Sequence, residues 1–272
     1  MSKQSNNDVR NYYNEHVKEE DARLDEHPFE IPVTLHFIKK YLSPGSSIFD
    51  VACGTGRIAK QLLKNRFVLG LNDLSDKNIE LVKNRLQHNR DVLFIDNDDA
   101  LNSNNWNKVH WDGILILGPL YHLQRKENRL KVLEFAYRHV KPGGYVFSSF
   151  MTRIGAMVYG IKNNPKGILH PDGARMLWGT GTDKRFVEDT EYFVNAYFSQ
   201  PEEINPLIEK AGLEPLNLAG VEGIFGERFE LYHQLDENLK KPWMDFIIKH
   251  CEDKRMVYQA KHLLSVARKP EI

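Results

Sequence analysis

A short segment that runs from an apolar stretch through an acid and two glycines into a helical pattern constrains the fold more than any other. Residues 48–57 read IFDVACGTGR. Gly54 and Gly56 permit a tight turn and the close approach of a ligand to the backbone. The segment therefore predicts a strand, a turn and a helix, with a ligand bound where the strand ends.

The alternation of strand and helix continues along the chain. Near-continuous apolar segments predict strands over 47–52, 66–73, 91–96, 111–118 and 145–150. Segments with apolar residues at helical spacing predict helices over 57–65, 75–89 and 126–140. Buried strands joined by right-handed helical crossovers predict an α/β fold with a doubly wound, mainly parallel sheet.

The flanking segments predict a cap and insertions on one domain that spans residues 1–272. Residues 1–42 are expected to form an N-terminal helical cap, with helices over 8–20 and 30–42, before the first half of the sheet in 43–150. Residues 151–198 form a long segment containing glycine, proline and aromatic residues, which predicts a lid or substrate-binding insertion.

Residues 199–272 are expected to complete the sheet with strands over 213–223 and 262–269. Ser199 and Glu202 have the spacing of a helix capping box. Between the two strands, the pattern predicts a mainly helical insertion over 226–258 with a break near Pro242.

The charge balance and cysteine count restrict the class of protein. There are 37 basic and 37 acidic side chains, and this zero net charge argues against a nucleic-acid or membrane partner. No apolar run approaches the roughly 18 residues that span a bilayer, and the polar start lacks a signal-peptide core. Cys53 and Cys251 give no disulfide framework, and no histidine pattern predicts a metal. We expect a cytoplasmic protein without a metal.

The glycine turn is compatible with two classes of cofactor. Residues 54–59 satisfy the G-x-G-x-x-G/A pattern of dinucleotide-binding turns. Asp73 follows at the end of the second expected strand, where a carboxylate binds a ribose diol. Nicotinamide dinucleotides and S-adenosylmethionine (SAM) both carry such a ribose, so these residues leave the choice open.

Five motifs in register resemble the class I SAM-dependent methyltransferases that act on small molecules. The motifs are DVACGTG (50–56), NDLS (72–75), DDA (98–100), WDGILILGPLYHL (111–123) and LKVLEFAYRHVKPGGYVFSSF (130–150). The resemblance implies a Rossmann-like sheet of seven strands whose last two are antiparallel. It also implies SAM as cofactor, S-adenosylhomocysteine (SAH) as product, and methyl transfer as the reaction.

The resemblance also implies which residues bind SAM. Asp73 would bind the ribose, Asp50 the methionine end, and either Asp98 or Asp99 the adenine amino group. The full expected set is Tyr13, Asp50, Ala52, Gly54, Thr55, Gly56, Arg57, Asp73, Leu74, Asp98, Asp99, Ala100, Leu117 and Gly118. Tyr13, with Tyr12, would belong to a lid over SAM, although packing within the helix explains both tyrosines equally well.

Tyr121 and His122 follow the fourth expected strand and are the candidate catalytic residues. They either pack over SAM or contact the acceptor, and His122 is the candidate general base because its unperturbed pKa lies near neutrality. The loop lacks the N/D-P-P-Y pattern of amino-methylases acting on bases. Further candidates for an aromatic acceptor pocket are His170, Trp178, Tyr192, Tyr197 and Phe198, although aromatic residues in a long loop more often form a small core of their own. Glu222 is a weaker candidate.

The sequence therefore predicts transfer of the SAM methyl group to an O, N or S nucleophile of a small molecule. Three alternatives stay open: an RNA or protein methyltransferase, an NAD(P)-dependent oxidoreductase, and a SAM-binding protein without catalysis. Neither the acceptor nor the oligomeric state follows from the sequence.

Overall fold

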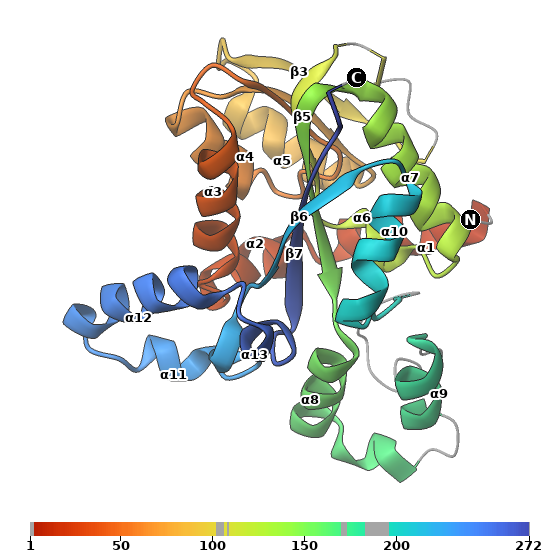
Figure 1. Ribbon diagram of the computed structural model, residues 1–272, viewed down its shortest axis with the longest axis vertical. Coiled ribbons are helices and arrows are strands. Elements are labelled where there is room, and N and C mark those ends of the chain that lie inside the picture. The colour runs from red at the N-terminus through yellow and green to blue at the C-terminus, as the bar shows by residue number, and fades with distance from the viewer. Residues whose placement is uncertain (1–2, 102–105, 108, 170–172, 183–195, 272) are drawn as a thin grey trace.

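A seven-stranded sheet forms the centre of the computed structural model, which describes residues 3–101, 106–107, 109–169, 173–182 and 196–271 (Figure 1). The strands are β1 Ser47–Asp50, β2 Val68–Asp73, β3 Val92–Asn97, β4 Trp111–Ile116, β5 Val140–Met151, β6 Glu214–Gly220 and β7 His262–Arg268. Their order is β3-β2-β1-β4-β5-β7-β6. Strands β1 to β5 pair in parallel, and β7 is antiparallel to both β5 and β6. The predicted doubly wound, mainly parallel sheet is confirmed.

Helices cover both faces of the sheet (Figure 1). The N-terminal helices are α1 Lys3–Glu15, α2 Val17–Glu26 and α3 Glu30–Tyr41, and the helices between strands are α4 Arg57–Lys64, α5 Asp76–Leu86, α6 Pro119–His122 and α7 Lys126–His139. After β5 come α8 Arg153–Asn163, α9 Gly173–Thr180 and α10 Ile204–Lys210, and after β6 come α11 Phe229–His233, α12 Glu237–His250 and α13 Lys254–Val257. Short 3₁₀ turns cover Pro165–Leu169, Pro201–Glu203 and Gly223–Phe225.

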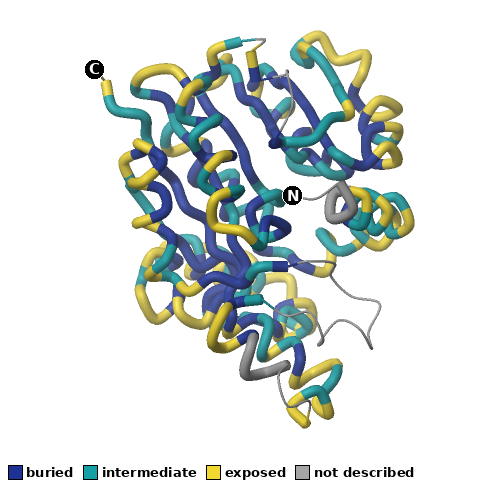
Figure 2. The backbone as a smooth tube through the Cα atoms, turned by 90° about the vertical axis from the view of Figure 1, so that its right-hand side faces the viewer, coloured by how far each residue is buried: buried dark blue, intermediate teal, exposed yellow. Residues whose placement is uncertain are grey.

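The core consists of two apolar layers because successive strand residues face opposite sides of the sheet. In β4, Leu115 packs with α3, α4 and α5, whereas Ile114 and Ile116 pack with α7 and α10. Strand β7 alternates in the same way, with Leu264 in the first layer and Leu263 in the second. Strands β1, β2, β4, β5 and β7 are accordingly buried along most of their length, whereas the edge strands β3 and β6 are mostly half-buried (Figure 2).

Three local expectations are wrong. The helix expected over 8–20 is two helices that meet at His16, whose Nδ1 contacts the Tyr12 carbonyl oxygen at 2.9 Å. No side-chain cap forms at Ser199, because Pro201 begins a 3₁₀ turn before α10. Helix α12 continues through Pro242, which removes only the bond that its N–H would donate to the Asn238 carbonyl. The insertion instead breaks at 234–236 and 251–253.

One edge of the sheet collects the ends of strands that are far apart in the sequence. The carboxyl ends of the parallel strands β1 to β5 lie on this edge. Because β7 is antiparallel to β5, with His262 opposite Met151, it begins at the same edge. Strand β6 ends there as well, with Gly220 opposite Leu263. Residues from both halves of the chain therefore face one site.

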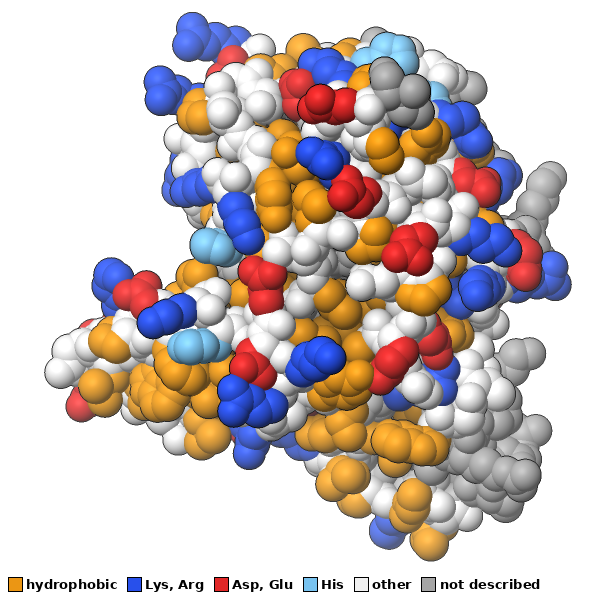
Figure 3. Space-filling model, in the orientation of Figure 1, with side chains coloured by type: hydrophobic (Ala, Val, Ile, Leu, Met, Phe, Trp, Pro, Cys, Tyr) orange, Lys and Arg blue, Asp and Glu red, His pale blue; other side chains and the backbone are white. Residues whose placement is uncertain are grey.

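Exposed apolar side chains gather on two helical projections (Figure 3). One group lies on α11 and α12 and comprises Leu231, Leu239, Trp243 and Phe246. The other lies on α8 and the turn after it and comprises Ile154, Val158, Ile161, Ile168 and Leu169. Within the described ranges, no helix combines the length and apolar character needed to cross a membrane.

Substitution of Gly70 tests the packing that places β2. A Cβ at Gly70 would lie 2.5 Å from Cη2 of Trp111 and 2.6 Å from Cζ of Phe94. We expect Gly70→Ala to lower the free energy of unfolding by about 1–3 kcal/mol in denaturant titrations. Gly179→Ala is the control, because in the described structure its added Cβ meets nothing within 4 Å beyond its own helix. Equal unfolding free energies for the two variants would contradict this packing.

Candidate functional site

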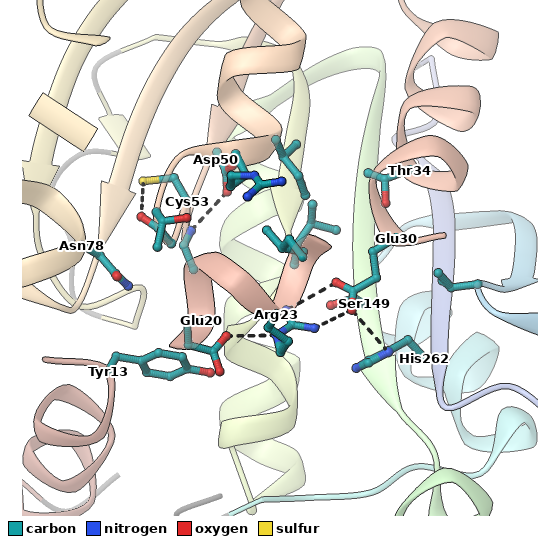
Figure 4. Close-up of a pocket in the computed structure, with 18 of the residues that line it drawn as sticks. Tyr13, Glu20, Arg23, Glu30, Thr34, Asp50, Cys53, Asn78, Ser149 and His262 are labelled. Atoms are coloured by element: carbon teal, nitrogen blue, oxygen red, sulfur yellow. Dashed lines mark hydrogen bonds and ion pairs between the residues drawn. The ribbon is translucent and has the colours of Figure 1, made fainter. Parts of the chain in front are cut away.

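A cavity with two connected lobes lies at this edge of the sheet. The β3-side lobe is lined by residues after β2, β3 and β4, including Asp73, Leu74, Asp98, Asp99, Ala100, Gly118 and His122. The β7-side lobe, drawn in Figure 4, is lined by residues that include Glu30, Thr34, Asp50, Ser149, Val221, His262 and Leu264. Tyr13, Arg23, Gly54, Asn78 and Tyr121 border both lobes. The two lobes therefore form one site.

The glycine turn separates β1 from α4 and exposes backbone to the cavity. Gly54 and Gly56 have φ angles of 53° and 80°, in the left-handed region that favours glycine. Gly54 lines both lobes, whereas Gly56 lines neither. A Cβ at Gly56 would lie 3.1 Å from Cγ2 of Val82, so Gly56 shapes the turn and lets α4 pack against α5.

The Asp73 carboxylate ties the glycine turn to the end of β2. Its Oδ2 accepts a hydrogen bond from the Gly54 N–H at 2.8 Å. Its Oδ1 accepts from the Ser75 N–H at 2.8 Å and from Nδ2 of Asn78 at 3.2 Å. Burial raises the pKa of Asp73 in spite of these bonds. The Oδ1 atom of Asn78 is buried without a hydrogen-bond partner in the described structure, so it has an open acceptor position at the cavity wall.

Asp50 is a second buried carboxylate, located at the end of β1. It is 2% exposed, and its Oδ1 accepts a long hydrogen bond of 3.4 Å from the Ala52 N–H. Burial, together with the charge of Asp73, raises the pKa of Asp50 to about 7. A cationic group in the β7-side lobe would stabilise its ionised form.

Asp98, Asp99 and Ala100 follow β3 and line the β3-side lobe. The Asp98 side chain accepts from the Asp99 N–H at 2.8 Å, and Asp99 accepts from the Leu101 N–H at 3.0 Å. The choice between Asp98 and Asp99 for an adenine amino group stays open.

Helices α1 and α2 cover the cavity and are attached to its rim by polar contacts. The Arg10 Nε donates to the Leu74 carbonyl at 3.1 Å, and Asn14 Oδ1 accepts from the Ser75 hydroxyl at 2.7 Å. Arg57 lines the β7-side lobe, but its guanidinium pairs with Asp25 of α2. The N-terminal helices therefore form a cap over the site.

Tyr13 of the cap meets the two residues predicted to be catalytic. Its hydroxyl lies 2.8 Å from Nε2 of His122, and Tyr121 borders both lobes. Burial raises the pKa of Tyr13 and also that of Tyr121. Both phenols are therefore neutral at physiological pH, and neither supplies a phenolate base.

Arg23 and Glu30, which the sequence reasoning missed, form a partly buried ion pair in the β7-side lobe (Figure 4). Nη1 of Arg23 lies 2.5 Å from Oε1 of Glu30, and its Nε lies 3.0 Å from Oε2 of Glu20. Burial raises the pKa of Glu30, but the charges of Arg23 and His262 outweigh it and lower the pKa to about 2. The carboxylate stays ionised throughout the physiological range.

His262 and Glu222 complete the far wall of the same lobe. Nδ1 of His262 lies 2.5 Å from Oε1 of Glu222, which is 0% exposed. The hydroxyl of Ser149 is buried on this wall without a hydrogen-bond partner in the described part of the chain. Glu222 was a weak sequence candidate. His262 was missed because it begins a strand, whereas the expected site residues follow strands.

The other residues that the sequence singled out lie partly at the cavity and partly away from it. Every residue of the expected SAM-binding set except Gly56 borders the cavity. Of the five aromatic candidates, His170 and Tyr192 lie outside the described residues. Phe198 packs in a small core with Met151 and Leu177, Tyr197 stacks on Arg129, and Trp178 is 60% exposed. None of these three borders either lobe.

Comparison with known proteins identifies the sequence family of the sheet's first half. Residues 48–144, from β1 to the beginning of β5, match the family model described as "Methyltransferase domain". A search of curated protein sequences finds no match.

Solved structures show the same fold at low sequence identity. The N-methyltransferase NodS from Bradyrhizobium japonicum WM9, in complex with SAH, is 13% identical, with a TM-score of 0.57 over 95% of this chain and 99% of that chain. The 1,6-didemethyltoxoflavin-N1-methyltransferase from Burkholderia thailandensis is 14% identical, with a TM-score of 0.58 over 96% and 87%. The [4+2]-cyclase SpnF is 15% identical, with a TM-score of 0.52 over 88% and 80%.

The resemblance that the five motifs indicated is confirmed. Residues 48–144 match the methyltransferase-domain family model, and the chain has the fold of the class I SAM-dependent methyltransferases.

Proposed function

We propose that the protein transfers the methyl group of SAM to an O, N or S nucleophile of a small molecule. The observation that carries this proposal is the pair of buried carboxylates, Asp50 and Asp73, beside the glycine turn. SAM is cationic at its sulfonium and at its ammonium, so it matches this negative wall. A nicotinamide dinucleotide would bring an anionic pyrophosphate to the same turn, where Asp50 would repel it.

Each part of SAM has a matching group in the cavity. Asp73 would bind the ribose hydroxyls, and Asp98 or Asp99 would accept from the adenine amino group beside Ala100. Asp50 would pair with the methionine ammonium, close to the exposed backbone of Gly54. The unpartnered Oδ1 of Asn78 borders both lobes and would accept from a ribose hydroxyl or from the ammonium.

This arrangement leaves for the acceptor the part of the β7-side lobe that is lined by Glu30, Ser149 and His262. SAM supplies an activated methyl group, because its sulfonium is a good leaving group. The protein has to align the nucleophile with the methyl carbon and exclude water, and such positioning is worth on the order of 7–11 kcal/mol. The cap that Tyr13 joins to His122 would exclude water. Tyr121, which borders both lobes, would lie between the cofactor and the acceptor, and the assignment of His122 as general base stays a prediction.

A small acceptor is favoured by the position of the lobe beneath the cap. The zero net charge of the chain supports an acceptor other than a nucleic acid, and a cytoplasmic location remains part of the proposal. The fold alone does not define the reaction, since a [4+2]-cyclase shares it. Release of SAH in the presence of an acceptor separates a transferase from a protein that only binds SAM.

Asp73→Ala tests the cofactor assignment. Because the substitution removes two charge-assisted hydrogen bonds to the ribose, we expect it to weaken SAH binding about a hundredfold or more in calorimetric titrations. Asp245→Asn is the matched control, since Asp245 is an exposed acid on α12 that pairs with Lys241. Asp73 also holds Gly54, so unfolding midpoints must show that the variant is folded. Wild-type protein that binds NADH instead of SAH would refute the assignment.

The pH dependence of SAH binding tests the role of Asp50. Its pKa of about 7 lies above the ordinary value of 3.8, so the free protein takes up a proton as the pH falls through 7. An ammonium selects the ionised carboxylate, and the affinity for SAH should therefore fall roughly five- to tenfold between pH 7.5 and pH 6.0.

Asp50→Asn provides the comparison for this titration. The variant keeps the shape of the side chain, but its amide does not ionise in this pH range. We expect weaker SAH binding that is nearly independent of pH over this range. A wild-type affinity that does not change with pH, or an unchanged pH slope in Asp50→Asn, would show that Asp50 does not contact the ammonium.

A further inference from the structure

The geometry of the β7-side lobe points to a general base that the sequence did not reveal. We propose that His262, oriented by the buried carboxylate of Glu222, accepts the proton of the acceptor during methyl transfer. This inference rests on the proposed function and names the residue that performs its proton transfer.

The hydrogen bonds of Glu222 determine which imidazole nitrogen carries the proton. Its Oε2 accepts from the backbone N–H of His262 at 2.9 Å and from that of Lys261 at 3.1 Å. Its Oε1 lies 2.5 Å from Nδ1 of His262. Because Oε2 of Glu222 already accepts from two backbone N–H groups and a carboxylate only accepts hydrogen bonds, we assign Nδ1 of His262 as the donor in the contact with Oε1. In the neutral ring, Nε2 then carries the lone pair.

The position of the His262 ring lets the lone pair on Nε2 face a methyl acceptor bound in the lobe. His262 lines the β7-side lobe, and in Figure 4 its ring projects toward Glu30 and Arg23. Within the described ranges, Nε2 makes no hydrogen bond, while Nδ1 is held by Glu222. The unpartnered hydroxyl of Ser149 borders the same space and offers a second hydrogen bond to a polar acceptor. His122 differs, because its Nε2 is already bonded to the Tyr13 hydroxyl.

The neighbouring groups favour proton chemistry at this cluster. Glu30, Glu222 and His262 place one side-chain atom each within 4.8 Å of one another. Arg23 neutralises Glu30, and backbone N–H groups satisfy Glu222, so the negative charge that would hold a cation is already compensated. Once His262 is protonated, the carboxylates of Glu222 and Glu30, the latter 3.7 Å from Nδ1, stabilise the imidazolium.

Two other titratable groups face the ring. The His27 ring lies 6.4 Å from that of His262, and burial lowers the pKa of His27 to about 3, so it stays neutral. The ammonium of Lys261 points to Glu227 at 2.8 Å. The charged groups around His262 are therefore the carboxylates of Glu222 and Glu30, together with Arg23, which pairs with Glu30, and Lys261, which pairs with Glu227.

The proposed step balances with SAM as the only co-reactant. The lone pair of a neutral O–H or N–H acceptor attacks the methyl carbon, and the carbon–sulfur bond breaks with its electron pair remaining on sulfur. SAH leaves as a neutral thioether, and the positive charge passes to the acceptor. Its proton then moves to Nε2 of His262, which becomes an imidazolium paired with Glu222.

The protonation state of the two ring nitrogens of His262 can be measured without a known methyl acceptor. In protein with ¹⁵N-labelled histidine and bound SAH, long-range ¹H–¹⁵N spectra at pH 8 should show His262 protonated at Nδ1 and unprotonated at Nε2. Glu222→Gln should shift the population toward the Nε2-protonated form. A wild-type ring protonated at Nε2 would overturn the proposal. SAH binding is measured by calorimetry on the same sample, so a failure of the proposed function is seen separately.

Turnover tests the same residue with small amines and phenols as acceptor probes. His262→Asn keeps a donor for Glu222 but has no equivalent of Nε2. We expect kcat, followed by SAH release, to fall about a hundredfold or more while the Kd for SAH stays within about twofold. Imidazole added to His262→Ala should restore part of the rate. His88→Asn, a change at an exposed histidine of the loop after α5, controls for the loss of a histidine.

The pH profile separates the two candidate bases. We expect the fall of kcat at acidic pH to disappear in His262→Asn and to remain in His122→Asn. This result would support the proposal. The reverse pattern would assign the base to His122 and overturn it. Inhibition of turnover by a chelator would also overturn it, because the cluster would then act through a metal.

Discussion

The hydrogen bonds of the Asp73 carboxylate hold the candidate site together. One oxygen binds the Gly54 N–H of the turn after β1, and the other binds the Ser75 N–H and the Asn78 amide at the start of α5. Two separate strand ends are thereby fixed at the position where a ribose is expected to bind. The cap depends on the same region, since Arg10 and Asn14 attach to Leu74 and Ser75. The residue proposed to recognise the cofactor therefore also builds its binding turn.

Charge divides the cavity into two chemically different halves. Asp50 and Asp73 are buried carboxylates without a cationic side chain bonded to them in the described structure, which suits a cationic cofactor. In the part of the β7-side lobe that His262 lines, by contrast, Arg23 neutralises Glu30, and Glu222 is satisfied by backbone and by His262. Negative charge that a ligand has to compensate therefore lies at Asp50 and Asp73, on the proposed cofactor side. The acceptor side retains groups that exchange a proton or a hydrogen bond, namely His262 and Ser149.

The sequence predicted the strand ends that border the proposed cofactor half of the cavity, because local patterns determine them. The glycine turn, Asp73 and the Asp98–Ala100 segment each follow a strand, and parallel strands bring their ends together whatever the details of the connections. The acceptor half depends on contacts between distant segments. Arg23 and Glu30 belong to the cap, Ser149 to β5, and His262 to a strand that runs the other way, and no short pattern links them. Tyr197 and Phe198 illustrate the converse, because aromatic character alone did not distinguish a pocket from a small core.

A crystal structure with SAH bound would test the central claim most directly. The account predicts the ribose hydroxyls at Asp73, the adenine beside Asp98 to Ala100, the ammonium at Asp50, and the sulfur directed to the lobe that contains His262. SAH bound elsewhere, or with its sulfur turned away from that lobe, would contradict the account. A nicotinamide dinucleotide occupying the same cavity would contradict it as well.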